Sequence, residues 1–242
     1  MVRAPLLKRI LPAALPAALA GALVGPLLGG GPLIPQAPPS PSPGGLLALP
    51  PPAAGTVPLD AALRERRTTR ALAGPALSLV EASQLAWSAQ GENRPGRRTV
   101  PSAHASYPLG LYLVTEGSPT LGAGTYRYQP GAHGFRSSGP KGVAALLGPI
   151  RAMQPWIVKA PAVFVVTGRP LKISSREPAP RMDYTFWEAG AASQALLLQA
   201  AALGLGAGVA SGVDLASVGA ALGLGPEEKV LVLLPVGRMK GK

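Results

Sequence analysis

The sequence predicts a three-layer α+β or α/β domain, in which helices cover a central sheet. Compact, uncharged apolar runs typical of buried strands occur at 109–115, 162–167 and 230–236. Between them lie longer segments with helical signals, of which the proline-free, Ala- and Leu-rich stretch 186–203 is the strongest. Strands separated by helices favour a layered domain with one hydrophobic core.

The two main predicted helices have recognisable ends. Ser78 and Glu81 have the S-x-x-E spacing of a capping box, which opens a helix that runs to about Gln90. The stretch 186–203 is followed by Gly204, a residue that commonly ends helices. The other expected elements are helices at 59–66, at 143–158 with a break at Gly148-Pro149, and from the cap Asp214 through Leu222, and a hairpin that joins 125–128 to 134–136.

The chain divides at about residue 58. Fourteen of its 29 prolines lie in the first 58 residues, which also lack the periodic apolar pattern needed to build a core. The remainder has the length of one domain. We therefore expect residues 1–31 to be a signal peptide or membrane anchor, residues 32–58 to be a Pro/Gly-rich linker, and residues 59–242 to fold.

The first 31 residues allow three interpretations. A basic start, the uncharged run Ile10–Leu28 and the small residues after it have the layout of a signal peptide, with Ala18-Leu19-Ala20 as a candidate cleavage motif. The same run approaches the ~20 residues that span a bilayer, which favours a retained membrane tether. Disordered low-complexity sequence is the third interpretation. The first two predict an exported protein, periplasmic or membrane-anchored, and the alternative is a cytoplasmic one.

Composition excludes several kinds of site. The absence of Cys rules out disulfides, thiolate zinc sites, cysteine nucleophiles and Cys-ligated iron–sulfur clusters, and two His leave little for metal or triad chemistry. The net charge of +12 favours an anionic partner. The densest basic clusters, 64–70 and 94–98, have no interleaved aromatic residues. We therefore expect no nucleic-acid partner, and salt-dependent binding would indicate the contrary.

Three segments carry chemical content. Arginines and threonines at 66–70 (R-R-T-T-R) make a compact anion cradle, because guanidinium groups donate bidentate hydrogen bonds to phosphate oxygens; a solvated charge run is the alternative. The loop 101–108 places small residues between prolines, which predicts a rigid loop with exposed backbone donors. The glycine run 204–208 is not predicted to bind a dinucleotide, because it closes a helix and enters a strand instead of the reverse.

Four motifs in this order resemble the nitroreductase-like flavoprotein family. They are R-R-T-T-R at 66–70, P-S-A-x-x-x-Y-P at 101–108, G-T-Y-R-Y at 124–128, and E-A-G-A-A-S-Q at 188–194 flowing into A-A-L-G-L-G. The resemblance covers about residues 59–238 and is closest to the SagB-type branch, whose members include peptide azoline dehydrogenases. It implies an α+β fold with a central mixed sheet flanked by helices, which forms a homodimer and binds FMN at the dimer interface.

The resemblance also implies where FMN binds. FMN needs neutralisation of its phosphate, a slot for a flat ring, and donors near N5 and O4. The implied contacts are Arg66, Arg67, Thr68, Arg70 and Arg238 for the phosphate and ribityl chain; Ser102, Ala103 and Ala105 for the ring, from the partner subunit; the backbone N–H groups of Ser211 and Gly212 for N5 and O4; and Gln194 on the interface helix, toward the flavin or in packing.

The sequence departs from the family pattern at two positions. Ala195 replaces the Asn that often follows Gln194, and Thr185 stands where Arg is common after Tyr. These differences concern the substrate side more than FMN binding. The nearest candidates for a Lys–Tyr pair that could act in azoline oxidation are Lys159 and Tyr184.

The expected function is that of an FMN-dependent oxidoreductase acting on a small nitro, quinone or similar organic substrate, with NAD(P)H as a candidate electron donor. Flavin carries the hydride chemistry itself, which agrees with the sparse inventory of acid–base side chains. Two alternatives stay open. One is a SagB-type dehydrogenase that oxidises azoline rings in a modified peptide, and the other is a flavin-binding module without catalysis.

Overall fold

The computed structural model describes residues 42, 44–150, 153–170, 181–210 and 212–240. The expected signal peptide or anchor and the first part of the expected linker lie outside these residues. Within them, every helix is too short or too polar to cross a membrane.

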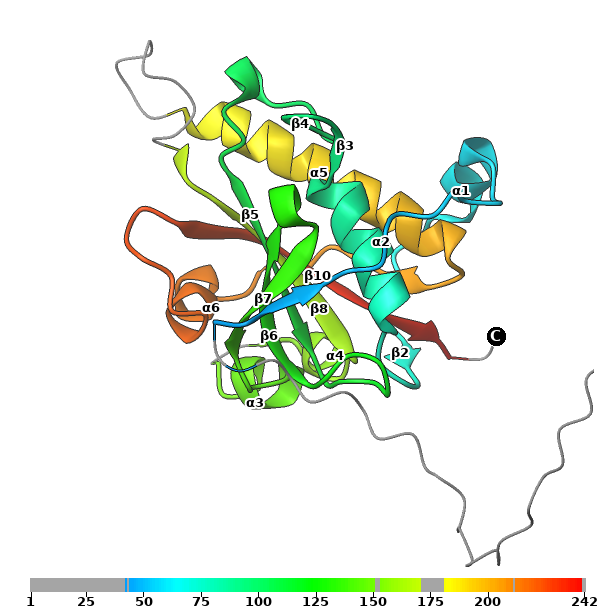
Figure 1. The fold of residues 1–242 in the computed structure, drawn as a ribbon. Helices are drawn as coiled ribbons and strands as arrows, with labels where there is room; N and C mark the ends of the chain where they lie inside the picture. Colours follow the sequence, from blue (N-terminus) through cyan, green and yellow to red (C-terminus); the bar gives the residue numbers. More distant parts are fainter. Residues whose placement is uncertain (1–41, 43, 151–152, 171–180, 211, 241–242) are drawn as a thin grey trace, which may run out of the picture. The chain divides into compact units, whose positions relative to one another are not determined.

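A central sheet of eight strands organises the described chain, with the order β1-β7-β6-β5-β8-β10-β2 and β9 also paired with β10 (Figure 1). Its ladders are antiparallel, and the parallel pairing among the described residues is an isolated bridge between Thr68 and Ala207. The strands are β1 (Leu46–Ala48), β2 (Leu72–Ala73), β5 (Leu109–Thr115), β6 (Gly124–Gln129), β7 (Gly134–Gly139), β8 (Ala162–Gly168), β9 (Gly206–Ala207) and β10 (Lys229–Met239), and a separate hairpin pairs β3 (Glu92–Arg94) with β4 (Arg97–Arg98).

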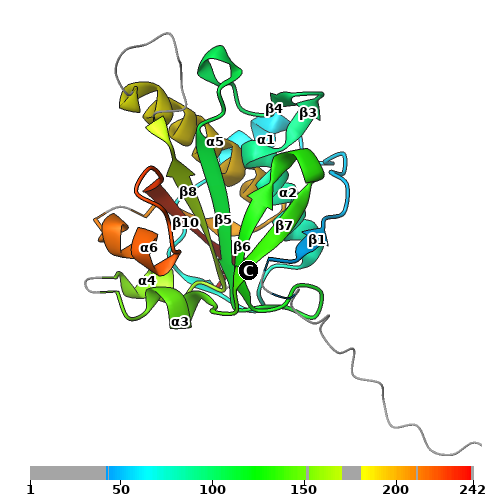
Figure 2. The same cartoon turned by 60° about the vertical axis from the view of Figure 1, so that its left-hand side comes forward.

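Helices cover both faces of this sheet (Figures 1 and 2). Because successive strand residues point to opposite faces, Phe164 of β8 enters one core while Val163 and Val165 enter the other. The first core contains α2 and α5, and the second contains α3, α4 and α6. The helices are α1 (Leu59–Glu65), α2 (Leu79–Gln90), α3 (Val143–Leu147), α4 (Pro155–Val158), α5 (Met182–Ala202) and α6 (Leu215–Ala221), with short 3-10 turns at Ala103–Ala105 and Pro130–Ala132.

The helix ends follow the sequence signals. Ser78 and Glu81 form both halves of the capping box of α2, and Asp214 caps α6 through Ser217 N. Gly204 follows the end of α5 with φ +69°, which a glycine adopts without strain. Helix α5 begins at Met182, earlier than the predicted residue 186. Asp183 lies in its first turn, where a negative charge interacts favourably with the helix dipole.

The folded domain begins before residue 59, which corrects the expected linker of residues 32–58. Leu46–Ala48 form the edge strand β1 beside β7, and Leu49 is buried. The ring of His133 bonds Pro50 O (2.8 Å), which ties the chain after β1 to the β6–β7 turn. A three-residue edge strand is too short to show a period-two pattern, so the sequence did not reveal it.

Candidate functional site

The cationic segment 66–70 follows the end of α1, begins in an extended conformation, and lies against the glycine run 204–208. Thr68 bridges Ala207, and Thr69 N donates to Ala207 O (2.9 Å). A Cβ at Gly208 would lie 3.1 Å from Thr68 Cγ2, and one at Gly206 would lie 2.9 Å from Thr69 Cγ2. The run therefore enters a strand, as predicted, and its glycines allow the cationic segment to approach closely.

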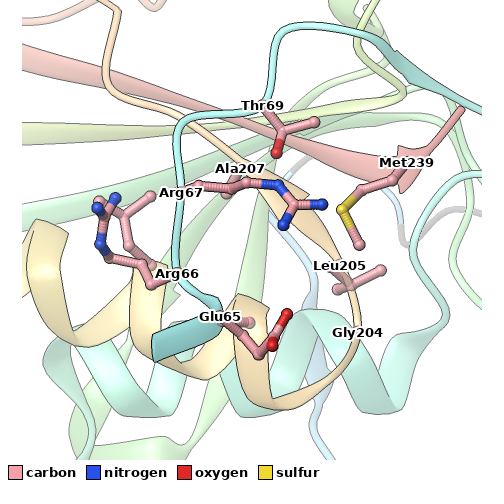
Figure 3. Close-up of a pocket in the computed structure, with 10 residues that line it drawn as sticks. Glu65, Arg66, Arg67, Thr69, Gly204, Leu205, Ala207 and Met239 are labelled. Atoms are coloured by element: carbon pink, nitrogen blue, oxygen red, sulfur yellow. The ribbon is translucent and has the colours of Figure 1, made fainter. Parts of the chain in front are cut away.

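The arginines at positions 66 and 67 point in opposite directions. A cavity of about 210 Å³ opens beside this segment, with Glu65, Thr69 and Met239 in its wall. Figure 3 shows Arg67 extending toward Met239, whereas Arg66 extends the opposite way. Extended backbone alternates its side chains between two sides, which accounts for this division.

Arg66 also lines this cavity, whereas Thr68 and Arg70 of the same segment lie toward Gly208 and Trp156. The guanidinium of Arg70 lies 5.8 Å from the centroid of the Trp156 ring, and that ring borders Gly208, where Thr68 also packs. Among the described residues, the arginines of this segment have no acidic partner within ion-pair distance. The guanidinium groups of Arg66 and Arg67 at the cavity, and of Arg70 beside Trp156, are thus available to an anion.

Arg238, an expected phosphate contact, is engaged in an ion pair. It donates two hydrogen bonds to the carboxylate of Glu81, at 2.6 and 2.9 Å. Burial would raise the pKa of Glu81, but hydrogen bonds from Arg238 and Ser78 outweigh it and hold that pKa below its usual range. In this structure Arg238 stabilises the start of α2, and it is not brought into the cavity that Arg67 enters.

The loop 101–108 is held by a buried carboxylate on α5. Ser102 Oγ and Ala103 N both donate to Glu188 Oε1 at 2.9 Å, and Tyr107 N donates to Ser102 Oγ at 2.8 Å. Ala105 and Tyr107 have φ values of 55° and 48°, which L-residues seldom adopt, so these contacts maintain a strained loop. Nothing in the sequence indicated a partner for Glu188. The available signal for a buried contact was an acidic residue in the Ala-rich part of a helix.

Burial shifts the pKa of this carboxylate. Only 7% of Glu188 is exposed, and burial raises its pKa despite the hydrogen bonds from Ala103 and Ser102. A carboxylate that accepts two hydrogen bonds from one loop fixes the position of that loop against the helix.

Two open, largely apolar grooves lie along α5. One, of about 350 Å³, has Ser102, Ala103 and Trp187 in its wall. The other, of about 260 Å³, has Gln194 and Val209 in its wall and continues from the glycine run. Small helix residues open the second groove, since a Cβ at Gly190 would meet no atom within 4 Å.

The structure bears differently on the remaining expected residues. Gly212 is exposed with φ +72°, and Ser211 lies outside the described residues. Lys159 follows α4 in the layer of the second core, whereas Tyr184 belongs to α5, which packs in the first. The two lie in layers on opposite faces of the sheet, which corrects their expectation as a Lys–Tyr pair.

Comparison with known proteins identifies the family. The profile of the Nitroreductase family matches residues 63–238. The chain belongs to the nitroreductase family. A Methanocaldococcus jannaschii protein assigned as a nitroreductase is 30% identical over 187 residues, which cover 74% of this chain and 90% of that protein. The crystal structure of a protein from Ralstonia eutropha, also assigned as a nitroreductase, has a TM-score of 0.71 and 26% identity, over 87% of this chain and 96% of that one.

More distant structures share the nitroreductase fold. The Escherichia coli microcin synthetase McbBCD, in complex with truncated pro-MccB17, matches with a TM-score of 0.62 and 19% identity over 80% of this chain and 78% of that chain. A Desulfovibrio desulfuricans protein assigned as a nitroreductase, solved in complex with FMN, matches with a TM-score of 0.54 and 21% identity over 76% of this chain and 87% of that chain.

Proposed function

We propose that this nitroreductase-family protein is an FMN-dependent oxidoreductase that transfers hydride through bound flavin to or from a small organic substrate. The observation that carries the proposal is the cationic segment 66–70, in which Thr68 packs at Gly208, Arg70 lies beside Trp156 and Arg66 lines the adjoining cavity. An apolar groove begins at Val209, the residue after Gly208. The FMN in the Desulfovibrio desulfuricans structure supports the choice of cofactor.

The residues fit the chemical demands of FMN. Arg66 and Arg70 offer charge-assisted donors, and Thr68 a hydroxyl, to a phosphate. The groove beside Gly190 and Val209 has the open, apolar character that a flat ring needs. Its wall also contains Gln194, which suits either of the roles expected for that residue.

When bound, FMN supplies the hydride acceptor and donor, so the chain needs only to bind, orient and exclude water. Backbone N–H groups at Ser211 and Gly212 would stabilise negative charge on the reduced ring. Glu188 acts as a positioning residue, because it holds Ser102 and Ala103 in one loop conformation.

Two copies are proposed to assemble the complete site. Exposed aromatic side chains lie on α5, where Phe186 is 55% and Trp187 is 69% exposed, and Val209 beside them is 45% exposed. Monomers seldom leave such a surface to water, so pairing along α5 would cover it and bring the loop of Ser102 to the partner.

The substrate separates two versions of the proposal. A nitro or quinone compound reduced with electrons from NAD(P)H is the first. Oxidation of azoline rings in a modified peptide is the second, favoured by the likeness to McbBCD with pro-MccB17 bound. A flavin-binding module without turnover is the third outcome, and redox assays with NAD(P)H and a quinone would separate it from the first.

Export of the protein is proposed from residues 1–31 alone. The mass of the mature protein and the cell fraction that contains it test this directly. A shortened or membrane-bound product supports a cleaved signal or a tether, whereas a full-length cytosolic product contradicts both.

The decisive experiment is a flavin titration of the purified full chain. We expect a yellow protein, or a colourless one that acquires flavin absorbance with FMN and binds riboflavin much more weakly, because riboflavin lacks the phosphate. A protein that binds neither flavin would overturn the proposal. Equal affinity for both would remove the phosphate role of the cationic segment.

A further inference from the structure

Strand β5 begins at the end of the sheet where β6 and β8 end (Figure 2). A second arginine-rich cavity lies at this end. Its volume is about 240 Å³. Three arginines from different elements line it: Arg98 of β4, Arg127 of β6, and Arg169 directly after β8. None of them belongs to the segment 66–70, and the residues of the proposed flavin site do not line this cavity.

One buried carboxylate serves two of these arginines. Glu228 is 5% exposed and accepts hydrogen bonds from Thr167 Oγ1 and from both Nε and Nη2 of Arg169. Arg127 Nη2 lies 3.5 Å from the same carboxylate. A Cβ at Gly110 would lie 2.7 Å from Glu228 Oε1, so the glycine leaves room for the carboxylate against β5.

Arg98 has no carboxylate within ion-pair distance among the described residues. Its Nη1 donates to the neutral amide of Gln90 (Oε1, 2.6 Å), and its guanidinium lies 4.6 Å from the centroid of the Tyr107 ring. Burial lowers the pKa of Arg98, which reflects the cost of removing a cation from water without a counter-ion. Exposed Glu92 and buried Glu188 act on it only through space.

Three guanidinium groups therefore line the cavity, and the one carboxylate that pairs with two of them, Glu228, is buried outside its wall. A bound anion would replace water around donors that the chain leaves unpaired, and low local dielectric would strengthen the interaction. The walls beside the arginines include the rings of Tyr107 and Tyr128 and the apolar side chain of Leu109, which suit an organic portion.

We propose that this cavity binds the carboxylate or phosphate group of a small organic acid, with Arg98, Arg127 and Arg169 donating to its oxygens. The site is separate from the proposed flavin site and does not depend on it.

The test is calorimetric titration of the full chain with two probes, citrate and inorganic phosphate. We expect at least one to bind with a Kd below roughly 1 mM. Binding of citrate alone identifies a carboxylate ligand, and binding of phosphate alone identifies a phosphate ligand. If neither binds with a Kd below roughly 1 mM, the proposal is wrong.

Matched variants locate the binding. Arg98→Gln should weaken it about tenfold or more, the loss expected for one charge-assisted hydrogen bond. Arg94→Gln removes the same charge from an exposed position of the same hairpin and should leave it unchanged. Equal losses in both variants would show a general charge effect and contradict the site. The double variant Arg66→Ala, Arg70→Ala should keep this binding, so failure of the flavin proposal and failure of this one are distinguishable.

A substitution of Glu228 should change anion affinity in the opposite direction. Glu228→Gln removes the negative charge that competes with a ligand, so the anion should bind about threefold or more tightly. Weaker binding in a folded Glu228→Gln protein, verified by circular dichroism, would contradict the proposal. If that variant does not fold, Arg127→Gln replaces it, with an expected loss of about tenfold.

Discussion

The two arginine-rich regions of this protein differ in how their charge is assembled and balanced. The segment 66–70 is contiguous in sequence, and its arginines have no acidic partner among the described residues. The second cavity gathers Arg98, Arg127 and Arg169 from separate elements, and the buried Glu228 pairs with Arg127 and Arg169 but not with Arg98. An exposed cation is hydrated and needs no counter-ion, whereas a buried one requires a partner from the fold or from a ligand.

This difference shows that similar residues take different roles according to the groups that the fold places around them. In the segment 66–70, backbone alternation directs the first two arginines to opposite sides. In the second cavity, strand register brings two of the arginines together. Tyr112 of β5 pairs with Arg127 of β6, and Leu109 of β5 pairs with Gly168, which precedes Arg169.

The largest expected effect concerns the segment 66–70. Arg66→Ala combined with Arg70→Ala should lower FMN affinity about 100-fold or more, since each arginine contributes a charge-assisted hydrogen bond of about 1.5 kcal/mol or more. Flavin fluorescence titration measures this loss. Arg64→Ala is the control, because Arg64 is exposed on α1 and paired with Asp60, and it should cost less than about threefold. Equal losses would contradict a specific role of Arg66 and Arg70.

The stability losses of two Gly→Ala variants compare how tightly the two regions are packed. Gly110→Ala should destabilise the fold by about 2 kcal/mol, because its Cβ would lie 2.4 Å from Thr167 Oγ1 and 2.7 Å from Glu228 Oε1. Gly208→Ala should cost less than about 1 kcal/mol, because its nearest contact, Thr68 Cγ2 at 3.1 Å, needs to move only slightly. Urea denaturation gives both values.

Gly139→Ala is the control for these two variants, because no atom lies within 4 Å of its Cβ position. Its stability should match that of the wild type. A larger loss in Gly208→Ala than in Gly110→Ala would mean that the cationic segment is the more tightly packed region, contrary to our expectation.

The smallest expected effect is an opposite pH dependence of two buried carboxylates. Burial would raise the pKa of Glu228, but hydrogen bonds from Thr167 and Arg169 outweigh it and lower that pKa. Its contribution to stability is therefore present above the unfolded pKa of about 4.3, and is lost as pH falls through the lower folded value. Burial raises the pKa of Glu188, so the fold takes up a proton there first and gains stability as pH falls from neutral toward about 4.3.

Urea denaturation between about pH 3 and 7 measures these slopes, with Glu228→Gln and Glu188→Gln as references that do not titrate. The stability of the wild type relative to Glu228→Gln should decrease below about pH 4.3, and relative to Glu188→Gln it should increase from neutral pH down to that value. Slopes of the same sign would show that one of the two carboxylates is in a different environment.

Local patterns predicted much of the fold. The strand at 109–115 and the capping box at Ser78 match the structure, and the nitroreductase fold expected from the order of the motifs is confirmed. The edge strand β1 was missed, because three residues carry no periodic signal. The proposed site was partly predictable. The motif R-R-T-T-R can be recognised in the sequence, whereas the ion pair of Arg238 with Glu81 joins residues far apart in the chain and leaves no local pattern.

Local patterns were sufficient to predict the main strands and helices, the caps of α2 and α6 and the contiguous cationic segment. These depend on hydrogen bonds and side-chain periodicity within a few residues, which a linear pattern records. Three features became visible only in the folded chain. Glu188 holds the 101–108 loop, the side chains of Arg66 and Arg67 extend in different directions, and three distant arginines line one cavity. Strand register and helix packing bring such groups together, and their partners are separated by too many residues for spacing to show.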